Sequence, residues 1–229
     1  MLTRLAAPAK LTLSLRVVGR RTDGYHLIDA EMVTLDLADE LEIGPGRNGR
    51  PPADLISRAL AAAGRDAAVV VRKRIPVGAG LGGGSADAAA VLRWAGCRDL
   101  ALAASLGADV PFCLLGGRAR VRGIGEVVEP LPFAPLVVTL LTPPFPVPTP
   151  AVYRAWDELG GPAGDHGNDL EPAALAVEPR LAEWRDRLAE ATGARPRLAG
   201  SGGSWFVPGA FPGVAGAVVA RAVPPSPTA

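Results

Sequence analysis

Alternating apolar and polar positions predict that the chain opens with two β-strands. In the first, from Ala9 to Val18, apolar side chains fall on one face, and the other face carries Lys10, Thr12, Ser14 and Arg16. The second strand is expected from Glu31 to Ile43. Asp23-Gly24 between the two is a strong turn signal, so the strands are expected to be joined by a turn.

Helical spacing and turn residues predict most of the remaining elements. Strands are expected over 68–75 and 136–141, a β-hairpin over 116–131, and helices over 54–63, 99–106 and 210–223, with a frayed end over 224–229. Two further helices are marked by their ends. One has Thr149 as N-cap, Pro150 as its first residue and an apolar face of Val152, Trp156 and Leu159. The other carries Leu181, Trp184 and Leu188 and is closed by Gly193.

A glycine-rich stretch joins the strand at 68–75 to an alanine-rich segment that is expected to be helical as far as Ala95. It contains five glycines, at positions 78, 80, 82, 83 and 84. Glycine allows positive φ angles and close approach of a ligand, and the following helix start offers free N–H groups and the positive end of the helix dipole. The stretch is therefore predicted to bind phosphate.

Three other kinds of segment could contain such a run of glycines. A Walker A loop needs a lysine before the serine, but Gly84 precedes Ser85, so that interpretation fails. Gly78, Gly80 and Gly83 satisfy the dinucleotide-binding pattern, yet the acidic residue expected about 20 positions later would be Asp99, which lies in a predicted helix. A flexible linker explains the glycines but not the apolar segments on both sides.

Composition and charge exclude several classes of function. The formal net charge of +1 provides no overall field for nucleic acid or an anionic membrane. Cys97 and Cys113 form neither a disulfide framework nor a zinc-binding spacing, so both are expected to be buried, reduced and inert. The chain shows no signal-peptide core and no membrane-spanning run. These features predict a soluble cytoplasmic protein without nucleic-acid or membrane partners.

The rarity of lysine points to one position. Lysine and arginine total 24, yet only Lys10 and Lys73 are lysines, so lysine is expected where a compact ammonium matters. Lys73, inside Arg-Lys-Arg, is expected to be a solvated strand residue, which leaves Lys10 as the candidate. Asp109 lies between small apolar residues and Val-Pro-Phe and would be costly to bury unpaired. Its predicted partner is Lys10, and a turn-forming aspartate is the alternative.

These motifs resemble the GHMP small-molecule kinases, and among them the 4-diphosphocytidyl-2-C-methyl-D-erythritol kinase family. The resemblance covers nearly the whole chain in the family's order, through segments 8–13, 23–26, 76–89, 107–112, 147–150 and 198–207. It implies a two-domain α+β GHMP kinase fold with mixed β-sheets, each covered by helices. The ATP-binding domain would span 1–134 and the second domain 135–229, crossing near Phe133, with the substrate site in the cleft between them.

The resemblance also implies a reaction. This is ATP-dependent phosphorylation of the 2-hydroxyl of 4-diphosphocytidyl-2-C-methyl-D-erythritol in non-mevalonate isoprenoid precursor (isopentenyl diphosphate) biosynthesis. The implied cofactors are ATP and Mg²⁺, whose ligands are not assigned. The implied catalytic residues are Lys10 and Asp109, and the implied substrate contacts are Tyr25, His26, Thr149 and Tyr153. The implied ATP-binding residues are Pro76, Val77, Gly78, Ala79, Gly80, Leu81, Gly82, Gly83, Gly84, Ser85 and Ala86.

The chain departs from the family's pattern at several positions. Thr12 and Asp54 stand where asparagine is usual, Gly202-Gly203 replaces a Gly-Ser order, and the connections over 63–67 and 94–106 are short. Asp54 is assigned first to a helix start. Two alternatives therefore remain. One is a GHMP kinase for another small alcohol, and the other is a catalytically silent paralogue that binds a nucleotide or a partner.

Overall fold

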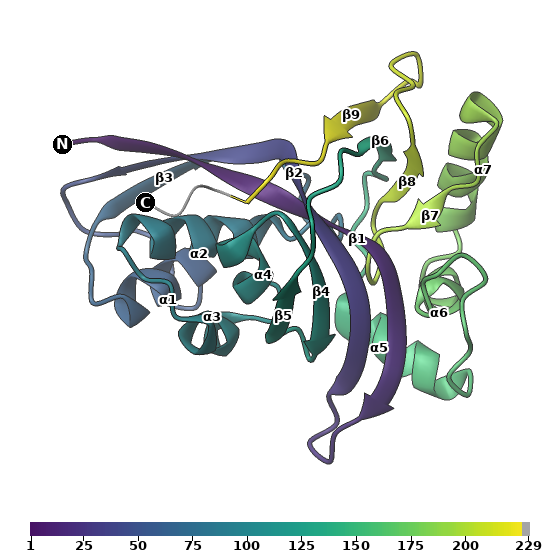
Figure 1. Ribbon diagram of the computed structural model, residues 1–229, viewed down its shortest axis with the longest axis horizontal. Helices are drawn as coiled ribbons and strands as arrows, with labels where there is room; N and C mark the ends of the chain where they lie inside the picture. Colours follow the sequence, from purple (N-terminus) through teal and green to yellow (C-terminus); the bar gives the residue numbers. More distant parts are fainter. Residues whose placement is uncertain (226–229) are drawn as a thin grey trace.

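The computed structural model describes residues 1–225 and contains two antiparallel β-sheets (Figure 1). The larger has the order β1-β2-β4-β5, with β3 also paired to β2, and the smaller has the order β7-β8-β6-β9. The strands are β1 (Thr3–Arg20), β2 (His26–Gly44), β3 (Ala68–Arg72), β4 (Arg118–Gly123), β5 (Val127–Pro130), β6 (Val137–Leu141), β7 (Arg197–Leu198), β8 (Trp205–Pro208) and β9 (Ala217–Arg221).

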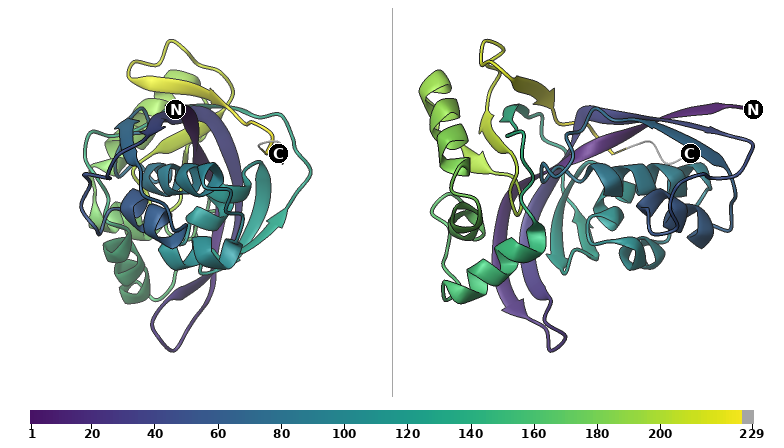
Figure 2. Two further views of the ribbon diagram at one scale, coloured as in Figure 1. Left: turned by 90° about the vertical axis from the view of Figure 1, so that its left-hand side faces the viewer. Right: turned by 180° about the vertical axis from the view of Figure 1, so that it is seen from behind.

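Helices cover both sheets, as the views from two sides show (Figure 2). Against the larger sheet lie α1 (Leu55–Ala62), α2 (Gly83–Trp94), α3 (Leu100–Leu106) and α4 (Val110–Leu115). Beside the smaller sheet lie α5 (Thr149–Glu158), α6 (Glu171–Val177) and α7 (Leu181–Thr192). The α+β class is confirmed. The sheets were expected to be mixed, but the named strands pair antiparallel, and parallel pairing within residues 1–225 is limited to a bridge between Leu15 and Asn168.

The two N-terminal strands form one long curved hairpin that extends beyond the predicted strand bounds. Its register shifts in three places, one of them between Pro8 and Lys10, and such bulges bend a strand and redirect its side chains. Both faces of β1 are buried around this point: Leu11 is fully covered, and Lys10 and Thr12 are 5% and 1% exposed. The polar side of β1 therefore faces the inside of the protein.

Two predicted helix features are wrong. The expected helix over 210–223 contains β9, whose β-branched Val218 and Val219 pair with β6 after a turn rich in glycine. Thr149 is not the N-cap of α5: the helix begins at Thr149 itself, the cap residue is Pro148, and no side chain caps it. Leu159 follows the helix and is exposed, so only part of the expected apolar face is covered.

Other predicted elements are confirmed. As predicted, Asp54 caps α1 with its carboxylate and Gly193 ends α7 in the left-handed conformation. Asp99 was expected inside its helix and is instead the N-cap of α3. Cys113 is buried, and burial raises the pKa of its thiol to about 12, but Cys97 is only half-buried. No helix within 1–225 is long and apolar enough to cross a membrane. The predicted frayed end falls partly on 226–229, which lie outside the described residues.

Asp169 fastens the segment before α6 to β1. Its carboxylate accepts hydrogen bonds from Arg16 Nη1 at 2.7 Å, Val17 N at 3.0 Å and Gly164 N at 3.1 Å. The backbone continues the contact, since Asp169 N donates to Leu15 O at 2.9 Å. The larger sheet and the second half of the chain are thus joined by buried polar groups, while the domain division at 134/135 stays a prediction.

Asp169→Ala is expected to lower the free energy of unfolding by about 2 kcal/mol, because it leaves the buried N–H of Gly164 and the half-buried N–H of Val17 without partners. Asp165→Ala, in the same loop but exposed, is the control and should stay within about 0.5 kcal/mol of wild type. Urea unfolding of both variants measures the difference. Equal stability of the two would show that the Asp169 contacts do not fasten this segment.

Candidate active site

The first glycine loop (residues 76–82) leads directly into α2. Gly78, Gly80 and Gly82 have φ angles of 73°, 74° and 68°, the left-handed region that glycine adopts at little cost. α2 is twelve residues long, and its N-cap, Gly82, has no side chain to cap the first N–H groups. The features that the predicted anion site requires are therefore present. The first N–H groups of α2 are uncapped, and a ligand can closely approach the glycine backbone that precedes them.

Lys10 packs directly on this loop. Its backbone N–H donates to Leu81 O at 3.1 Å, and a Cβ at Gly82 would lie 2.8 Å from Lys10 Cγ. Two features thus require glycine at position 82: its positive φ angle, and the side chain of Lys10, which occupies the space where a Cβ would lie. The contact fixes the position of the ammonium relative to the start of α2.

The ammonium of Lys10 faces a carboxylate and a hydroxyl. Lys10 Nζ lies 3.5 Å from Asp109 Oδ2 and donates to Thr12 Oγ1 at 3.1 Å. The lysine side chain is 6% exposed and that of Asp109 is 32% exposed. The predicted pairing of these residues, 99 positions apart, is present in the structure, and the aspartate is the more open partner. Thr12 supports the ammonium where the related sequences were expected to have asparagine.

Three predicted substrate contacts line the cleft where the β1–β2 hairpin lies beside α5. The rings of His26 and Tyr153 stack with centroids 4.8 Å apart and 24° between their planes. Tyr25 is 60% exposed. Burial raises the pKa of Tyr153 to about 12, and the negative charge of Asp109 adds to the effect. Tyr153 therefore stays protonated and lies within electrostatic range of the Lys10–Asp109 pair.

A second glycine loop (residues 199–203) packs backbone to backbone on the first. A Cβ at Gly80 would lie 2.6 Å from both Ala199 O and Gly202 O, and one at Gly203 would lie 2.4 Å from Gly78 O. The hydroxyls of Thr149 and Ser201 are 2.7 Å apart. The second loop thus joins the start of α5 to the first loop.

One cleft of about 1110 Å³ contains the whole constellation. Among its lining residues are Lys10, Tyr25, His26, Asp109, Thr149, Tyr153 and every residue from Pro76 to Ser85. Ala86 is the exception: it is buried, does not line the cleft, and its N–H already donates to Gly82 O. Ala86 therefore lies in the first turn of α2 behind the cleft surface, and its ATP contact stays a prediction.

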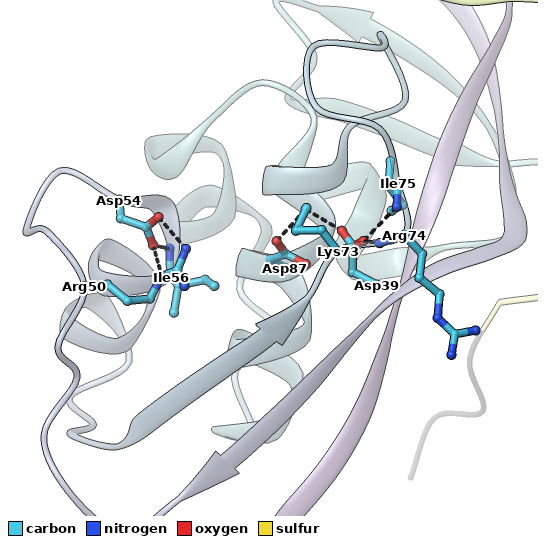
Figure 3. A network of polar contacts seen from close by, with 8 residues as sticks. All are labelled: Asp39, Arg50, Asp54, Ile56, Lys73, Arg74, Ile75 and Asp87. Atoms are coloured by element: carbon cyan, nitrogen blue, oxygen red, sulfur yellow. Dashed lines mark hydrogen bonds and ion pairs between the residues drawn. The ribbon is translucent and has the colours of Figure 1, made fainter. Parts of the chain in front are cut away.

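Lys73 is solvent-exposed, as predicted, but it follows the end of β3 and its ammonium is paired with two carboxylates, which the sequence did not predict. Figure 3 shows it between Asp39 of β2 and Asp87 of α2, with Nζ 3.0 Å from Asp87 Oδ2. Asp39 is fully buried and also accepts from Arg74 N at 2.6 Å and Ile75 N at 2.8 Å. This carboxylate holds the entrance of the first glycine loop. Burial works to lower the pKa of Lys73, but its hydrogen bonds to the two carboxylates raise it above the usual value.

Asp87 is the second carboxylate around this single cation. Burial raises its pKa to about 6 despite the hydrogen bond from Lys73, because Lys73 is already shared with Asp39. One oxygen, Oδ1, is buried and has no hydrogen-bond partner. Asp87 was not among the predicted site residues. It could have been noticed as a charged residue within an alanine run on a helix that packs against a sheet.

Asp54 carries out the helix-start role predicted for it. Its Oδ1 accepts from Ile56 N at 3.0 Å and from Arg50 Nε at 2.9 Å, and Oδ2 accepts from Arg50 Nη2 at 3.0 Å (Figure 3). The side-chain hydrogen bond from Arg50 lowers the pKa of Asp54. Arg50 itself lines the cleft, so this end of the site presents a guanidinium in place of an amide.

The arrangement is suited to phosphoryl transfer. Uncapped helix donors can hold a polyphosphate, a buried ammonium can face the moving group, and an open carboxylate can orient a hydroxyl. No group of three His, Cys, Asp or Glu side chains in residues 1–225 could hold a metal ion by itself. Mg²⁺ is commonly held by one or two carboxylates together with substrate phosphates, so this donor set fits a nucleotide-bound ion and not a protein cage.

Comparisons with known proteins agree with this geometry. The sequence model of the GHMP kinases N terminal domain matches residues 53–117. Proteins named 4-diphosphocytidyl-2-C-methyl-D-erythritol kinase are 41% identical in Paracoccus denitrificans, over 96% of this chain and 90% of that protein, and 38% identical in Cereibacter sphaeroides, over 90% and 88%. A crystal structure of 4-(cytidine 5'-diphospho)-2C-methyl-D-erythritol kinase matches with a TM-score of 0.78 at 33% identity, over 96% of this chain and 98% of that one.

Asp87→Asn is expected to change how stability depends on pH. A raised pKa means that the folded protein holds this proton more tightly than the unfolded chain, so wild type loses stability as the pH rises from about 4 to about 7. The variant lacks this proton, so its free energy of unfolding relative to wild type should rise by about 1–3 kcal/mol over that window. Urea unfolding across the window measures this, with the exposed Asp165→Asn as control. A difference that stays constant with pH would contradict the raised pKa.

Proposed function

The chain belongs to the 4-diphosphocytidyl-2-C-methyl-D-erythritol kinase family of GHMP kinases, and we propose that it phosphorylates this diphosphocytidyl alcohol. It is an ATP-dependent kinase with an alcohol acceptor. The group transferred is the γ-phosphoryl of ATP, the acceptor is the 2-hydroxyl, and the reaction belongs to non-mevalonate isoprenoid precursor biosynthesis. A cytoplasmic location stays a prediction.

A single observation carries the proposal. Lys10 and Asp109 meet 3.5 Å apart beside the first glycine loop, in the same cleft as His26 and Tyr153. A phosphate site, a reacting pair and an aromatic pocket therefore share one continuous space. A nucleobase stacked on an aromatic side chain gains about 1–3 kcal/mol, which supports a substrate that carries cytidine.

The first glycine loop and the start of α2 bind the ATP phosphates in this mechanism. Lys10 faces the γ-phosphoryl group and the acceptor oxygen, where its ammonium stabilises the charge that develops during transfer. Ser85 and Asp87 are oxygen donors of α2 that line the cleft and would hold a Mg²⁺ ion, which would supply positive charge to the phosphates. Most of its ligands would be phosphate oxygens and water.

Asp109 orients the acceptor hydroxyl. Its carboxylate is open to the cleft while its partner Lys10 is buried, so it can accept a hydrogen bond from the hydroxyl. The proton passes to Asp109 late, when the attacking oxygen has begun to bond to phosphorus and the proton has become acidic. Thr12 keeps the ammonium directed at this point.

An assay of ATP consumption tests the proposal. Turnover with 4-diphosphocytidyl-2-C-methyl-D-erythritol, and at least about 100-fold lower kcat/KM with mevalonate or homoserine, is the expected result, because neither alcohol fills the aromatic pocket. Turnover of another alcohol would favour the alternative GHMP kinase. Nucleotide binding without any turnover would favour a catalytically silent paralogue.

Lys10→Ala and Asp109→Asn are each expected to lower kcat by roughly 10²- to 10⁴-fold, because each removes a group that acts on the reacting atoms. ATP affinity, measured by calorimetry, should change less than about threefold, since the loop and α2 bind the polyphosphate. Wild-type kcat in either variant would rule out the proposed mechanism.

Gly82→Ala is expected to displace the stem of Lys10 and to lower kcat by at least about 10-fold. Gly96→Ala is the matched control, because Gly96 also has a positive φ, of 77°, but a Cβ there meets nothing within 4 Å. Both variants should lose about 1 kcal/mol of stability from backbone strain. Thermal unfolding and steady-state kinetics separate the two effects, and equal kcat in both variants would argue against the lysine contact.

A further inference from the structure

Asp157 is a charged residue at the hairpin end of the cleft that the proposed mechanism does not use. It lies in the last turn of α5, four residues after Tyr153, so both side chains leave the helix on one face. Its Oδ1 lies 2.7 Å from His26 Nε2 and its Oδ2 lies 3.3 Å from Arg20 Nη1. Since Arg20 ends β1 and His26 begins β2, one carboxylate joins α5 to both strands at the hairpin tip.

The imidazole of His26 is held on three sides. Tyr153 stacks on one face, Trp156 meets the ring edge-on with centroids 5.6 Å apart, and Asp157 binds Nε2. The side chain is 8% exposed, and the residue lines the cleft. In the part of the chain that the structure describes, the other ring nitrogen, Nδ1, makes no hydrogen bond. The ring is therefore fixed in orientation but keeps one nitrogen for a ligand.

Asp157 determines which ring nitrogen carries the proton. An ionised carboxylate can only accept a hydrogen bond, so Nε2 must be the donor. Arg20 shares the same carboxylate through Oδ2, which leaves Oδ1 to His26. In a neutral imidazole protonated at Nε2, the remaining lone pair lies on Nδ1.

We infer that Asp157 is a positioning and selectivity residue, which holds His26 as the Nε2–H tautomer so that Nδ1 accepts a hydrogen bond from the substrate's base. Such an acceptor suits the exocyclic amino group at C4 of cytosine. Uracil has a carbonyl oxygen at C4, and two acceptors facing each other form no hydrogen bond. This inference rests on the proposed function, because it concerns the base of that substrate.

The tautomer can be measured without any catalytic activity. The chain has two histidines, so ¹⁵N–¹H NMR of the labelled full-length protein resolves their ring nitrogens, and His166→Gln identifies the signals of His26. The expected spectrum has a protonated Nε2 and an unprotonated Nδ1 in wild type, and a mixture of tautomers in Asp157→Ala. A proton on Nδ1 of His26 in the wild-type protein would overturn the inference.

Kinetics test the consequence for selectivity. Asp157→Ala should raise KM for the cytidine substrate and reduce its kcat/KM advantage over the uridine analogue, each by roughly 10-fold, the scale of one lost hydrogen bond. KM for ATP should stay within about twofold, since the printed partners of Asp157 are His26 and Arg20 at the hairpin and none belongs to the helix start that binds phosphate. Asp157→Asn, which keeps an acceptor oxygen, should lie between Asp157→Ala and wild type. The neighbouring exposed Glu158→Ala is the control and should match wild type.

Different results would contradict the proposed function and the role of Asp157. Wild-type protein that turns over neither substrate would contradict the proposed function, while the NMR spectrum would still report on the tautomer. Wild-type turnover with an unchanged cytidine-to-uridine ratio in Asp157→Ala would overturn the inference alone. Equal losses with both bases, together with a raised KM for ATP, would also overturn it, because that pattern indicates a purely structural role.

Discussion

The site depends on the burial of one ammonium group. Removing a charge from water is costly unless it is paired and hydrogen-bonded. Lys10 meets this requirement with the carboxylate of Asp109 and the hydroxyl of Thr12. Its stem occupies the space that Gly82 leaves by lacking a side chain. The helix start, the reacting pair and the curvature of β1 are therefore set by the same contact, and changing any one of them would move the others.

Buried polar residues outside the proposed ligand contacts hold the loops around Lys10 in place. Asp39 fixes the entrance of the first glycine loop through two backbone N–H groups and Lys73. Asn168 donates to Leu198 O and Gly200 O, which fixes the second loop, and Asp169 fastens the neighbouring segment to β1. Loops rich in glycine lose much conformational entropy on folding, so these side chains supply the order that the loops cannot supply themselves.

The sequence predicted the elements whose cause is local and missed those set by tertiary pairing. Helix ends at Asp54 and Gly193 follow from capping, and the glycine loop follows from its composition. The strand at 217–221 was read as helix because its partner, β6, lies 80 positions earlier in the chain. The partners of Lys73 and the roles of Asp87 and Asp157 were missed for the same reason, since each side chain pairs with a residue on another element. Lys10 and Asp109 were paired through their unusual surroundings and a family resemblance.

A crystal structure of the protein with a non-hydrolysable ATP analogue and 4-diphosphocytidyl-2-C-methyl-D-erythritol tests the central claim most directly. The account predicts that the polyphosphate contacts the N–H groups at the start of α2, and that the 2-hydroxyl lies about 3 Å from the Asp109 carboxylate with Lys10 Nζ beside the terminal phosphate. A polyphosphate bound elsewhere, or a 2-hydroxyl pointing away from Lys10 and Asp109, would contradict it.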